Sequence, residues 1–190
     1  MVEDVVGGLL SGNYQMIVAW ALEEGAEAPT AWPVAGLRSW EQSGEGLGDR
    51  LYESLGRACC EFNSVCVIGT DHPGLDKRRV EEAFAALEEE SEVVLGPAAD
   101  GGYYLLGLRA SALTEKLFVG IDWSTSRVLS QTLERCEEAG LSVHRLSVAY
   151  DIDTLPDVLD LERRLRQGEL DSPRVAAVLA AWHDRRESAS

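Results

Sequence analysis

Aspartates follow three apolar runs of the chain, at the points where buried strands are expected to end. Asp71 follows residues 64–69, Asp100 follows 92–96, and Asp151 and Asp153 follow 141–148. In sheets flanked by helices, ligands bind beyond the carboxyl ends of the strands. Carboxylate oxygens are the ligands that hard cations such as Mg²⁺ or Mn²⁺ prefer. This pattern predicts a cation site at one edge of a sheet.

Some of these aspartates also have a plain structural explanation. Asp71 precedes Pro73 and Gly74, so it could simply form a turn. In the segment YDIDTLPDVLDL, Thr154 and Asp157 match a helix-capping pattern. The cap leaves Asp151 and Asp153 unexplained, and two residues apart on an extended segment they point to the same side. A shared cation would account for the pair.

The stretch DGGYY at 100–104 places two glycines beside an acid and ahead of the next strand. A tight turn with positive φ would explain Gly101 and, in part, Gly102. We favour a second interpretation, in which Gly101 and Gly102 leave room for a ligand to approach the backbone. Asp100 would then border that ligand, and Tyr103 would begin a strand beside it.

Apolar runs alternate with amphipathic segments along the whole chain. Strands are expected at 14–22, 64–69, 92–96, 103–108 and 141–148, and helices at 47–62, 76–90, 124–140 and 155–168. This order predicts an α/β fold with a mixed, mainly parallel sheet and helices on both faces. Residues 1–168 form one expected domain, followed by a tail at 169–190 with one helix.

The composition excludes several classes of protein. The chain has 190 residues and a net charge of −16, which argues against nonspecific nucleic-acid binding. No run is apolar enough to span a membrane, and the amino end lacks a basic signal region, so a cytoplasmic location is expected. The four cysteines lack metal-ligand spacing and are expected to be reduced thiols. A phosphorylated ligand would need a divalent cation or local arginines to offset the acids.

Five segments together resemble one known family, namely QSGEGLGDRL, GTDHPGL, LGPAADGGYYLLGL, DWSTSRVL and YDIDTLPDVLDL. In order and spacing they resemble the small GT-A-type, glycosyltransferase-like proteins also described as radical-SAM/selenodomain-associated transferases. The resemblance covers roughly residues 1 to 165. It implies the sheet of the nucleotide-diphospho-sugar transferases, Mg²⁺ or Mn²⁺ as cofactor, a nucleotide or nucleotide-sugar donor and a small acceptor.

The resemblance also implies roles for individual residues. Asp71 would be a metal ligand, with Asp153 or Asp151 as the second carboxylate, and Asp71, Asp100 and Asp153 would form the catalytic set. Trp123 would line the acceptor side, although a loop Trp folded onto the core is an equally good interpretation. The expected substrate-binding residues are Gly69, Gly101, Gly102, Tyr103, Trp123 and Arg50.

The amino end departs from the family pattern. Members usually open with a strand and a glycine-containing loop that ends in Lys-Thr-Arg and holds the nucleotide, whereas MVEDVVGGLL resembles the later part of the helix that follows. One βα element, on the order of thirty residues, is therefore expected to be missing. Two functions follow: a metal-dependent glycosyl or nucleotidyl transferase, or a noncatalytic domain that acts as a binding module. The exposed sheet edge is expected to be covered by the tail helix or by a homodimer partner.

Overall fold

The larger of two sheets has four strands in the computed structural model, which describes residues 2–22, 25–28, 37–70, 72, 75–149, 155–168 and 172–187. Its order is β3 (Ser64–Ile68), β5 (Tyr103–Arg109), β4 (Val93–Pro97) and β6 (Val143–Arg145). β5 runs antiparallel to both neighbours, and β4 runs parallel to β6. The sheet is therefore mixed. Every residue of β4 is buried, as expected for an apolar strand that is covered on both faces.

The smaller sheet pairs β1 (Ile17–Trp20) with β2 (Arg38–Glu41) in parallel. The apolar run at 14–22 predicts β1, but no pattern in the sequence predicts β2, whose region was expected to be a loop. β2 reads Arg-Ser-Trp-Glu and is largely exposed. A polar strand on a sheet edge lacks the apolar pattern on which a strand prediction depends.

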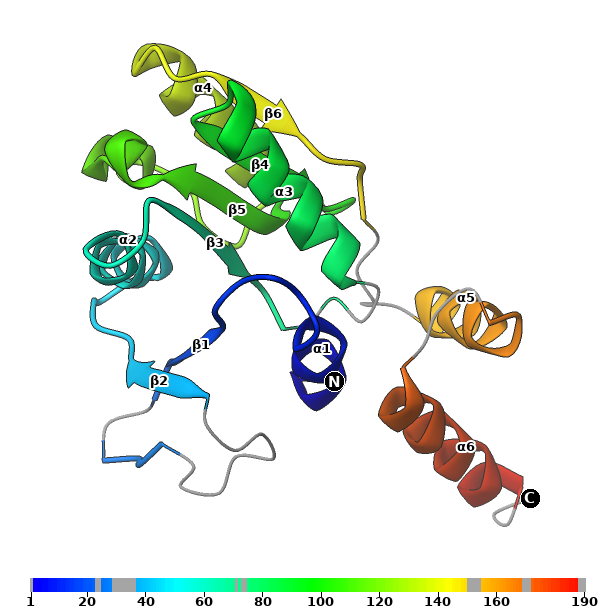
Figure 1. Cartoon of the computed structure of the whole chain (residues 1–190). Coiled ribbons are helices and arrows are strands. Elements are labelled where there is room, and N and C mark those ends of the chain that lie inside the picture. Colours follow the sequence, from blue (N-terminus) through cyan, green and yellow to red (C-terminus); the bar gives the residue numbers. More distant parts are fainter. Residues whose placement is uncertain are drawn as a thin grey trace.

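Helices cover both faces of the larger sheet, as predicted (Figure 1). Helices α1 (Val2–Leu9) and α3 (Lys77–Glu89) share one core cluster with residues of β4 and β5. A second cluster joins α2 (Leu47–Cys59) and α4 (Val128–Glu138) to the opposite face, together with the short turns η1 (Ala110–Ala112) and η2 (Glu115–Leu117). The sheet thus lies between two apolar layers.

Two helix starts show how local chemistry sets the boundaries. Asp76 caps α3, because its carboxylate accepts a hydrogen bond from the Arg79 amide at 3.1 Å. Helix α4 begins at Val128, later than the predicted Ser124. The delay arises because Thr125 Oγ1 donates to the Asp122 carbonyl at 2.7 Å and keeps this segment in a loop.

The tail forms the predicted helix, but its packing partners differ from those we expected. Helix α6 (Pro173–Glu187) contacts α1 and α5 (Leu155–Arg166). Figure 1 shows α5 and α6 together at the end of the molecule, away from β4 and β6. The tail therefore packs on helices rather than on the open edge of the larger sheet.

Two predictions from composition are also tested. All four cysteines are free, but they are less buried than expected for packed thiols: Cys136 is buried, Cys59 and Cys66 are half-buried and Cys60 is exposed. Among the residues that the structure describes, no helix is both long enough and apolar enough to cross a membrane.

Candidate functional site

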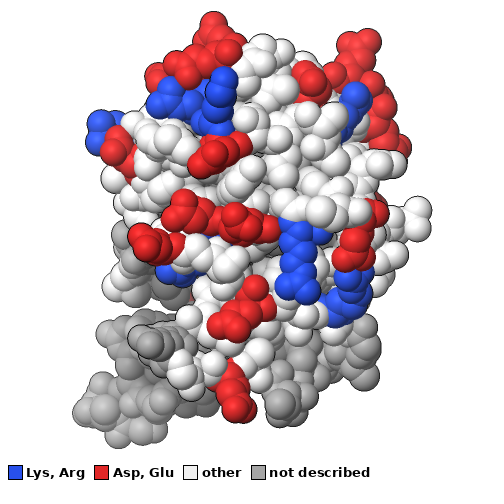
Figure 2. Space-filling model, turned by 90° about the vertical axis from the view of Figure 1, so that its left-hand side faces the viewer, with Lys and Arg blue, Asp and Glu red and all other residues white. Residues whose placement is uncertain are grey.

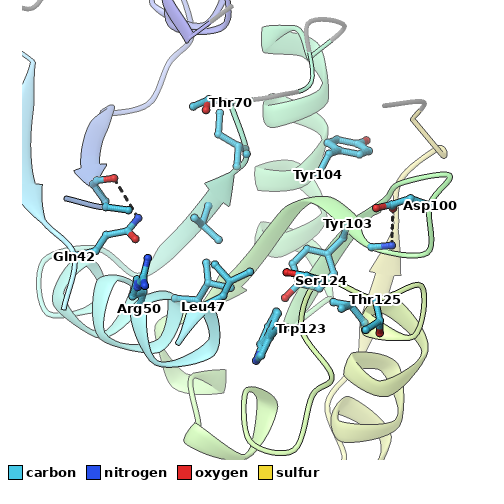
Figure 3. Close-up of a pocket in the computed structure, with 18 of the residues that line it drawn as sticks. Gln42, Leu47, Arg50, Thr70, Asp100, Tyr103, Tyr104, Trp123, Ser124 and Thr125 are labelled. Atoms are coloured by element: carbon cyan, nitrogen blue, oxygen red, sulfur yellow. Dashed lines mark hydrogen bonds between the residues drawn. The ribbon is translucent and has the colours of Figure 1, made fainter. Parts of the chain in front are cut away.

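A cavity of about 940 Å³ lies at the carboxyl ends of β1 and β3. Its walls come from the ends of these strands, from α2, from the turn that precedes β5 and from the loop that precedes α4 (Figure 3). In the close-up, Gln42 and Arg50 lie on one side, and Trp123, Ser124 and Asp100 lie on the other. The cavity is therefore built from segments that are far apart in the sequence.

The turn beside Asp100 is fixed by its own hydrogen bonds. Asp100 Oδ1 accepts from the Gly102 amide at 2.8 Å, and the Ala98 amide donates to the Gly102 carbonyl at 3.0 Å. Gly101 has a φ of +92°, and a Cβ there would lie 2.2 Å from the Ser126 carbonyl oxygen. Gly101 is thus required by the turn and by close packing on the loop before α4.

That loop, residues 121–127, forms the opposite wall and is held in place at two points. The Leu129 amide donates to the Gly101 carbonyl at 2.9 Å. Trp123 packs on Gly48 of α2, where a Cβ would lie 2.5 Å from Trp123 Nε1. Ser124 adopts a φ of +61°, which is uncommon for a residue with a side chain. The wall is preformed, with an aromatic ring and hydroxyl groups facing the cavity.

The charge of the cavity is sparse and divided between its sides. Arg50 is the only basic residue and Asp100 the only acidic one among the described residues that line it. Acidic groups also dominate the chain as a whole, and no broad basic patch forms on the face in Figure 2. A diphosphate in this cavity would find one guanidinium, so a metal ion would be needed to balance its charge.

Two adjacent tyrosines form the floor near the turn. Burial raises the pKa of Tyr103 well above its usual value, so its ring is a neutral wall. Tyr104 is also buried, its hydroxyl donates to the Ser147 carbonyl at 3.2 Å, and its ring stacks on His72 with centroids 5.1 Å apart. The stacking gives His72 a structural role in the wall beside Tyr104.

The three aspartates predicted to bind metal, Asp71, Asp151 and Asp153, lie outside the described residues. Within the described part of the chain, no group of three or more His, Cys, Asp or Glu side chains could hold a metal ion. The described residues nearest to the aspartates, His72 and Ala149, line one small cavity of about 330 Å³ with Tyr104. His72 and Ala149, which flank these segments in the sequence, therefore lie in the same part of the structure.

Most of the other predicted site residues lie together. The large cavity is lined by six of them, namely Arg50, Gly69, Asp100, Gly102, Tyr103 and Trp123. Gly101 is not among the lining residues, because the space beside it is filled by Ser126. Sequence reasoning missed the lining residues Trp20, Gln42 and Ser124 to Ser126. Gln42 and the three hydroxyl residues stand in segments that carry the family resemblance, which is the signal that could have identified them.

Solved structures give the fold an independent comparison. A crystal structure from Desulfovibrio desulfuricans G20, described provisionally as a nucleotide-diphospho-sugar transferase, matches with a TM-score of 0.81 and 28% identity. The match covers 95% of this chain and 79% of that one. CMP:2-keto-3-deoxy-manno-octonic acid synthetase complexed with CTP matches at TM-score 0.58 and 17% identity, over 89% of this chain and 88% of that one.

A third structure, 2-C-methyl-D-erythritol 4-phosphate cytidylyltransferase from Thermus thermophilus, gives a TM-score of 0.56 and 17% identity, over 87% of this chain and 88% of that one. These neighbours are nucleotidyl and sugar transferases, and they confirm the predicted GT-A-like fold. No curated protein matches the sequence significantly. A family model described as "Uncharacterized protein conserved in bacteria (DUF2064)" matches residues 9–125, so the chain belongs to the DUF2064 family.

Proposed function

We propose that this protein is a metal-dependent transferase that moves a glycosyl or nucleotidyl group from a nucleotide donor to a small acceptor. The observation that carries the proposal is the cavity at the carboxyl ends of β1 and β3, in a fold shared with nucleotidyl and sugar transferases. In sheets of this kind, ligands bind beyond the carboxyl ends of the strands. The described transferase of D. desulfuricans is the comparison that favours a nucleotide-sugar donor.

The walls of the cavity suit the parts of such a donor. Trp20 and Trp123 offer ring faces for a base or a sugar, because flat aromatic surfaces stack on both. Arg50 supplies a fixed positive charge for phosphate oxygens. The carboxylate of Asp100 and the hydroxyl of Ser124 lie on the other side of the cavity, where Asp100 can accept hydrogen bonds from sugar or acceptor hydroxyls and Ser124 can accept or donate them.

A divalent cation fits the oxygen ligands that the aspartates of this chain offer. Asp71, Asp151 and Asp153 provide hard oxygen ligands for Mg²⁺ or Mn²⁺. Thr70, which directly precedes Asp71, lines the large cavity, and His72 on its other side lines the small one. When bound there, the cation would supply positive charge to offset the charge that builds on the leaving phosphate. Because Arg50 is the one cationic side chain among the described residues that line the cavity, a diphosphate donor would depend on this contribution.

The second candidate is a noncatalytic binding domain. The observation that favours it is the scarcity of positive charge around the cavity, where Arg50 is the only basic residue among the described lining residues. Arg38 of β2 is paired with the carboxylate of Glu61 at 2.7 Å. Such a domain would keep the fold but bind an uncharged ligand or a partner.

Isothermal titration separates the two candidates. CTP, UTP, GTP and UDP-glucose are titrated into the protein, each with and without Mn²⁺. A transferase site predicts that at least one of them binds in a Mn²⁺-dependent manner and that Asp71→Asn or Asp153→Asn weakens binding by about tenfold or more. Glu53→Gln, a change of an exposed acid on α2, is the matched control and should leave binding unchanged.

Absence of binding to all four compounds with Mn²⁺ would overturn the transferase proposal in favour of the noncatalytic domain. A second outcome is that a nucleotide binds with the same affinity with and without Mn²⁺, and with the same affinity to the Asp71→Asn variant. That result would show a nucleotide site that does not depend on the metal, and it would overturn the proposed metal dependence. Light scattering on the same samples would test whether the chain forms a homodimer, the second of the two arrangements expected to cover the sheet edge.

A further inference from the structure

The small cavity beside Tyr104 is lined by charged side chains that the proposed transferase site does not use. Its volume is about 330 Å³, and it is lined by Arg79 of α3 and by Arg163 and Arg164 of α5. In Figure 1, the end of α3 at which the helix begins lies toward α5. The cavity therefore brings together cations from two helices that are far apart in the sequence.

Positive charge is in excess among the described residues that line this cavity. Three arginines and one acid, Asp160, line it, whereas the large cavity has one basic and one acidic residue. The chain as a whole carries 33 acidic and 17 basic residues. A hollow with positive charge on so acidic a chain attracts anions locally, because the surrounding surface repels them.

Helix electrostatics explains only two of the three arginines. Arg163 and Arg164 stand in the last turn of α5, where the negative end of the helix dipole stabilises a cation. Arg79 stands in the first turn of α3, where the positive end of the dipole disfavours one. Within that turn, which the structure describes in full, no residue is acidic. An anion bound between the two helices would account for the position of Arg79.

The guanidinium of Arg79 has a distant ion-pair partner. Its Nη1 lies 3.8 Å from Glu82 Oε2, well beyond the length of about 2.7–2.9 Å of a charge-assisted hydrogen bond. The carboxylate of Asp76 is engaged by the Arg79 amide at 3.1 Å and by Arg78 Nε at 2.9 Å. The Arg79 side chain is 35% exposed, so it is partly shielded from water. A bound anion would give this guanidinium a closer acceptor.

The one acidic residue of the described lining is held by a neighbouring cation. Asp160 Oδ1 accepts from Arg163 Nε at 3.1 Å and from Arg163 Nη2 at 2.8 Å. This contact offsets the charge of Asp160 and so reduces its repulsion of an anion. The described lining keeps an excess of two positive charges, since it has three arginines and one acid. That excess matches a phosphate monoester, which carries about −1.5 to −2 at pH 7.

The uncharged walls of the cavity are fixed. Tyr104 is 4% exposed, and its ring stacks on His72 with centroids 5.1 Å apart. The Ala149 amide donates to the Pro97 carbonyl at 2.8 Å, and the Ala149 carbonyl accepts from the Ala99 amide at 2.9 Å. These bonds tie the wall to the end of β4. A preformed cavity of this kind has less ordering to do when a ligand binds.

We propose that this cavity binds a phosphate group, carried either by inorganic phosphate or by a small phosphate monoester, with Arg79 and Arg164 as partners. Guanidinium groups bind phosphate through paired N–H···O hydrogen bonds. The volume of about 330 Å³ is near the lower end of the range for ligand pockets, about 300–1,000 Å³, which suits a ligand smaller than a nucleotide. Tyr104 lines both cavities, so this site borders on the proposed donor site without depending on it.

Amide NMR on the full chain, without nucleotide or divalent metal, tests this proposal. Sodium phosphate and glycerol 3-phosphate are titrated separately near neutral pH, at constant ionic strength because salt alone screens charges. We expect saturable shifts at the amides of Arg79, Tyr104 and Ala149. Arg79→Gln and Arg164→Gln should each weaken binding by about tenfold or more. Arg78→Gln is the matched control: it removes the same charge from the same turn, at a side chain that is 84% exposed and outside the described lining.

Saturable shifts that Arg79→Gln and Arg164→Gln weaken, and that Arg78→Gln changes by less than about twofold, support the proposal. The probe that binds more tightly then identifies inorganic phosphate or a monoester as the source of the group. Absence of saturable shifts at millimolar concentrations of both probes, or an equal loss in Arg78→Gln, overturns the proposal. Saturable shifts at Arg50 and Ser124 instead would overturn it in favour of phosphate binding in the large cavity. If Arg79→Gln does not fold, as judged by its melting curve, Arg164→Gln and the shifts of the unmodified chain decide the outcome.

Discussion

Strands β4 and β3 have similarly apolar sequences, yet one is enclosed and the other is open. Val93, Val94 and Leu95 of β4 are each 0% exposed, whereas every residue of β3 is half-buried. β4 pairs on both sides, with β5 and β6, while β3 pairs on one side, with β5, among the described strands. The difference shows that burial here is set by neighbouring strands and not by the hydrophobicity of the strand itself.

The same division runs through the candidate site. The turn at Asp100 and the loop of Trp123 belong to the enclosed half, and their shapes are fixed by backbone hydrogen bonds and close packing. The opposite wall, with Trp20 and Gln42, belongs to the open half, where β1 and β3 each pair on one side among the described strands. We therefore expect single substitutions in the enclosed half to weaken ligand binding strongly. Substitutions in the open half should weaken it less.

The largest effect is expected at Gly101, in the enclosed half. Gly101→Ala adds a Cβ that would lie 2.2 Å from the Ser126 carbonyl oxygen, at a φ of +92°. We expect a loss of roughly 3 kcal/mol in the free energy of unfolding, measured by urea denaturation. Gly140→Ala is the control, since its φ is +70° but no atom lies within 4 Å, and it should lose only about 1 kcal/mol. Equal losses would show that the contact with Ser126 is unimportant.

A matched pair of valines compares the two halves directly. Val93 on β4 and Val67 on β3 both pack on the same core cluster, but only Val93 is fully buried. We expect Val93→Ala to lower the free energy of unfolding by about 2 kcal/mol and Val67→Ala by about half as much or less. The same urea experiment gives both values. A larger loss at Val67 would contradict the division into an enclosed and an open half.

Deletion of residues 173–190 tests what the tail does. Because α6 contacts α1 and α5, we expect its removal to lower the melting temperature by a few degrees. Amide exchange at Ile17 and Ala19 of β1 and at Cys66 and Ile68 of β3 should be unaffected, since no described residue of α6 lines the cavities between these two strands. Faster exchange at these amides after deletion would restore the original expectation that the tail covers the open edge.

The smallest effect is a pH dependence in the enclosed half. Burial raises the pKa of the Cys136 thiol to about 11, compared with about 8.5 in an unfolded chain. Below about pH 8 the thiol is protonated in both states. Between about pH 9 and about pH 11 only the unfolded chain loses this proton, so stability falls over that interval. Cys136→Ala should flatten the decline in urea midpoint between these pH values, and an unchanged slope would rule out this contribution.

The parts of the fold that the sequence predicted correctly are those set by residues close to one another in the chain. The apolar runs of β3, β4 and β5 and the capped helix α3 follow from residues near each other in the chain. Strand β2 was missed, because its residues Arg38 to Glu41 are polar on an exposed edge. An open sheet edge was expected from the resemblance, but which strands border it was not, because the pairing of β1 with β2 and of β3 with β5 depends on strands that come together from different parts of the chain.

The candidate site was predictable to a similar degree. Asp100, Gly102 and Trp123 stand in recognisable segments, and all three line the cavity. The role of Gly101 was misread in part, since the neighbour that requires its missing side chain is Ser126, 25 residues along the chain. Contacts of this kind are set by how two loops pack, and spacing along the chain does not reveal them.

The most direct test of the proposed metal-dependent site is to locate a bound metal ion. Crystals grown with Mn²⁺ and a nucleoside diphosphate would be measured at a wavelength at which manganese scatters anomalously. We predict one strong peak beside Asp71 and the Asp151–Asp153 segment, with oxygen ligands at about 2.2 Å and the nucleotide in the cavity between Arg50 and Trp123. A nucleotide bound there with no manganese peak near these aspartates, or manganese bound elsewhere on the acidic surface, would contradict it.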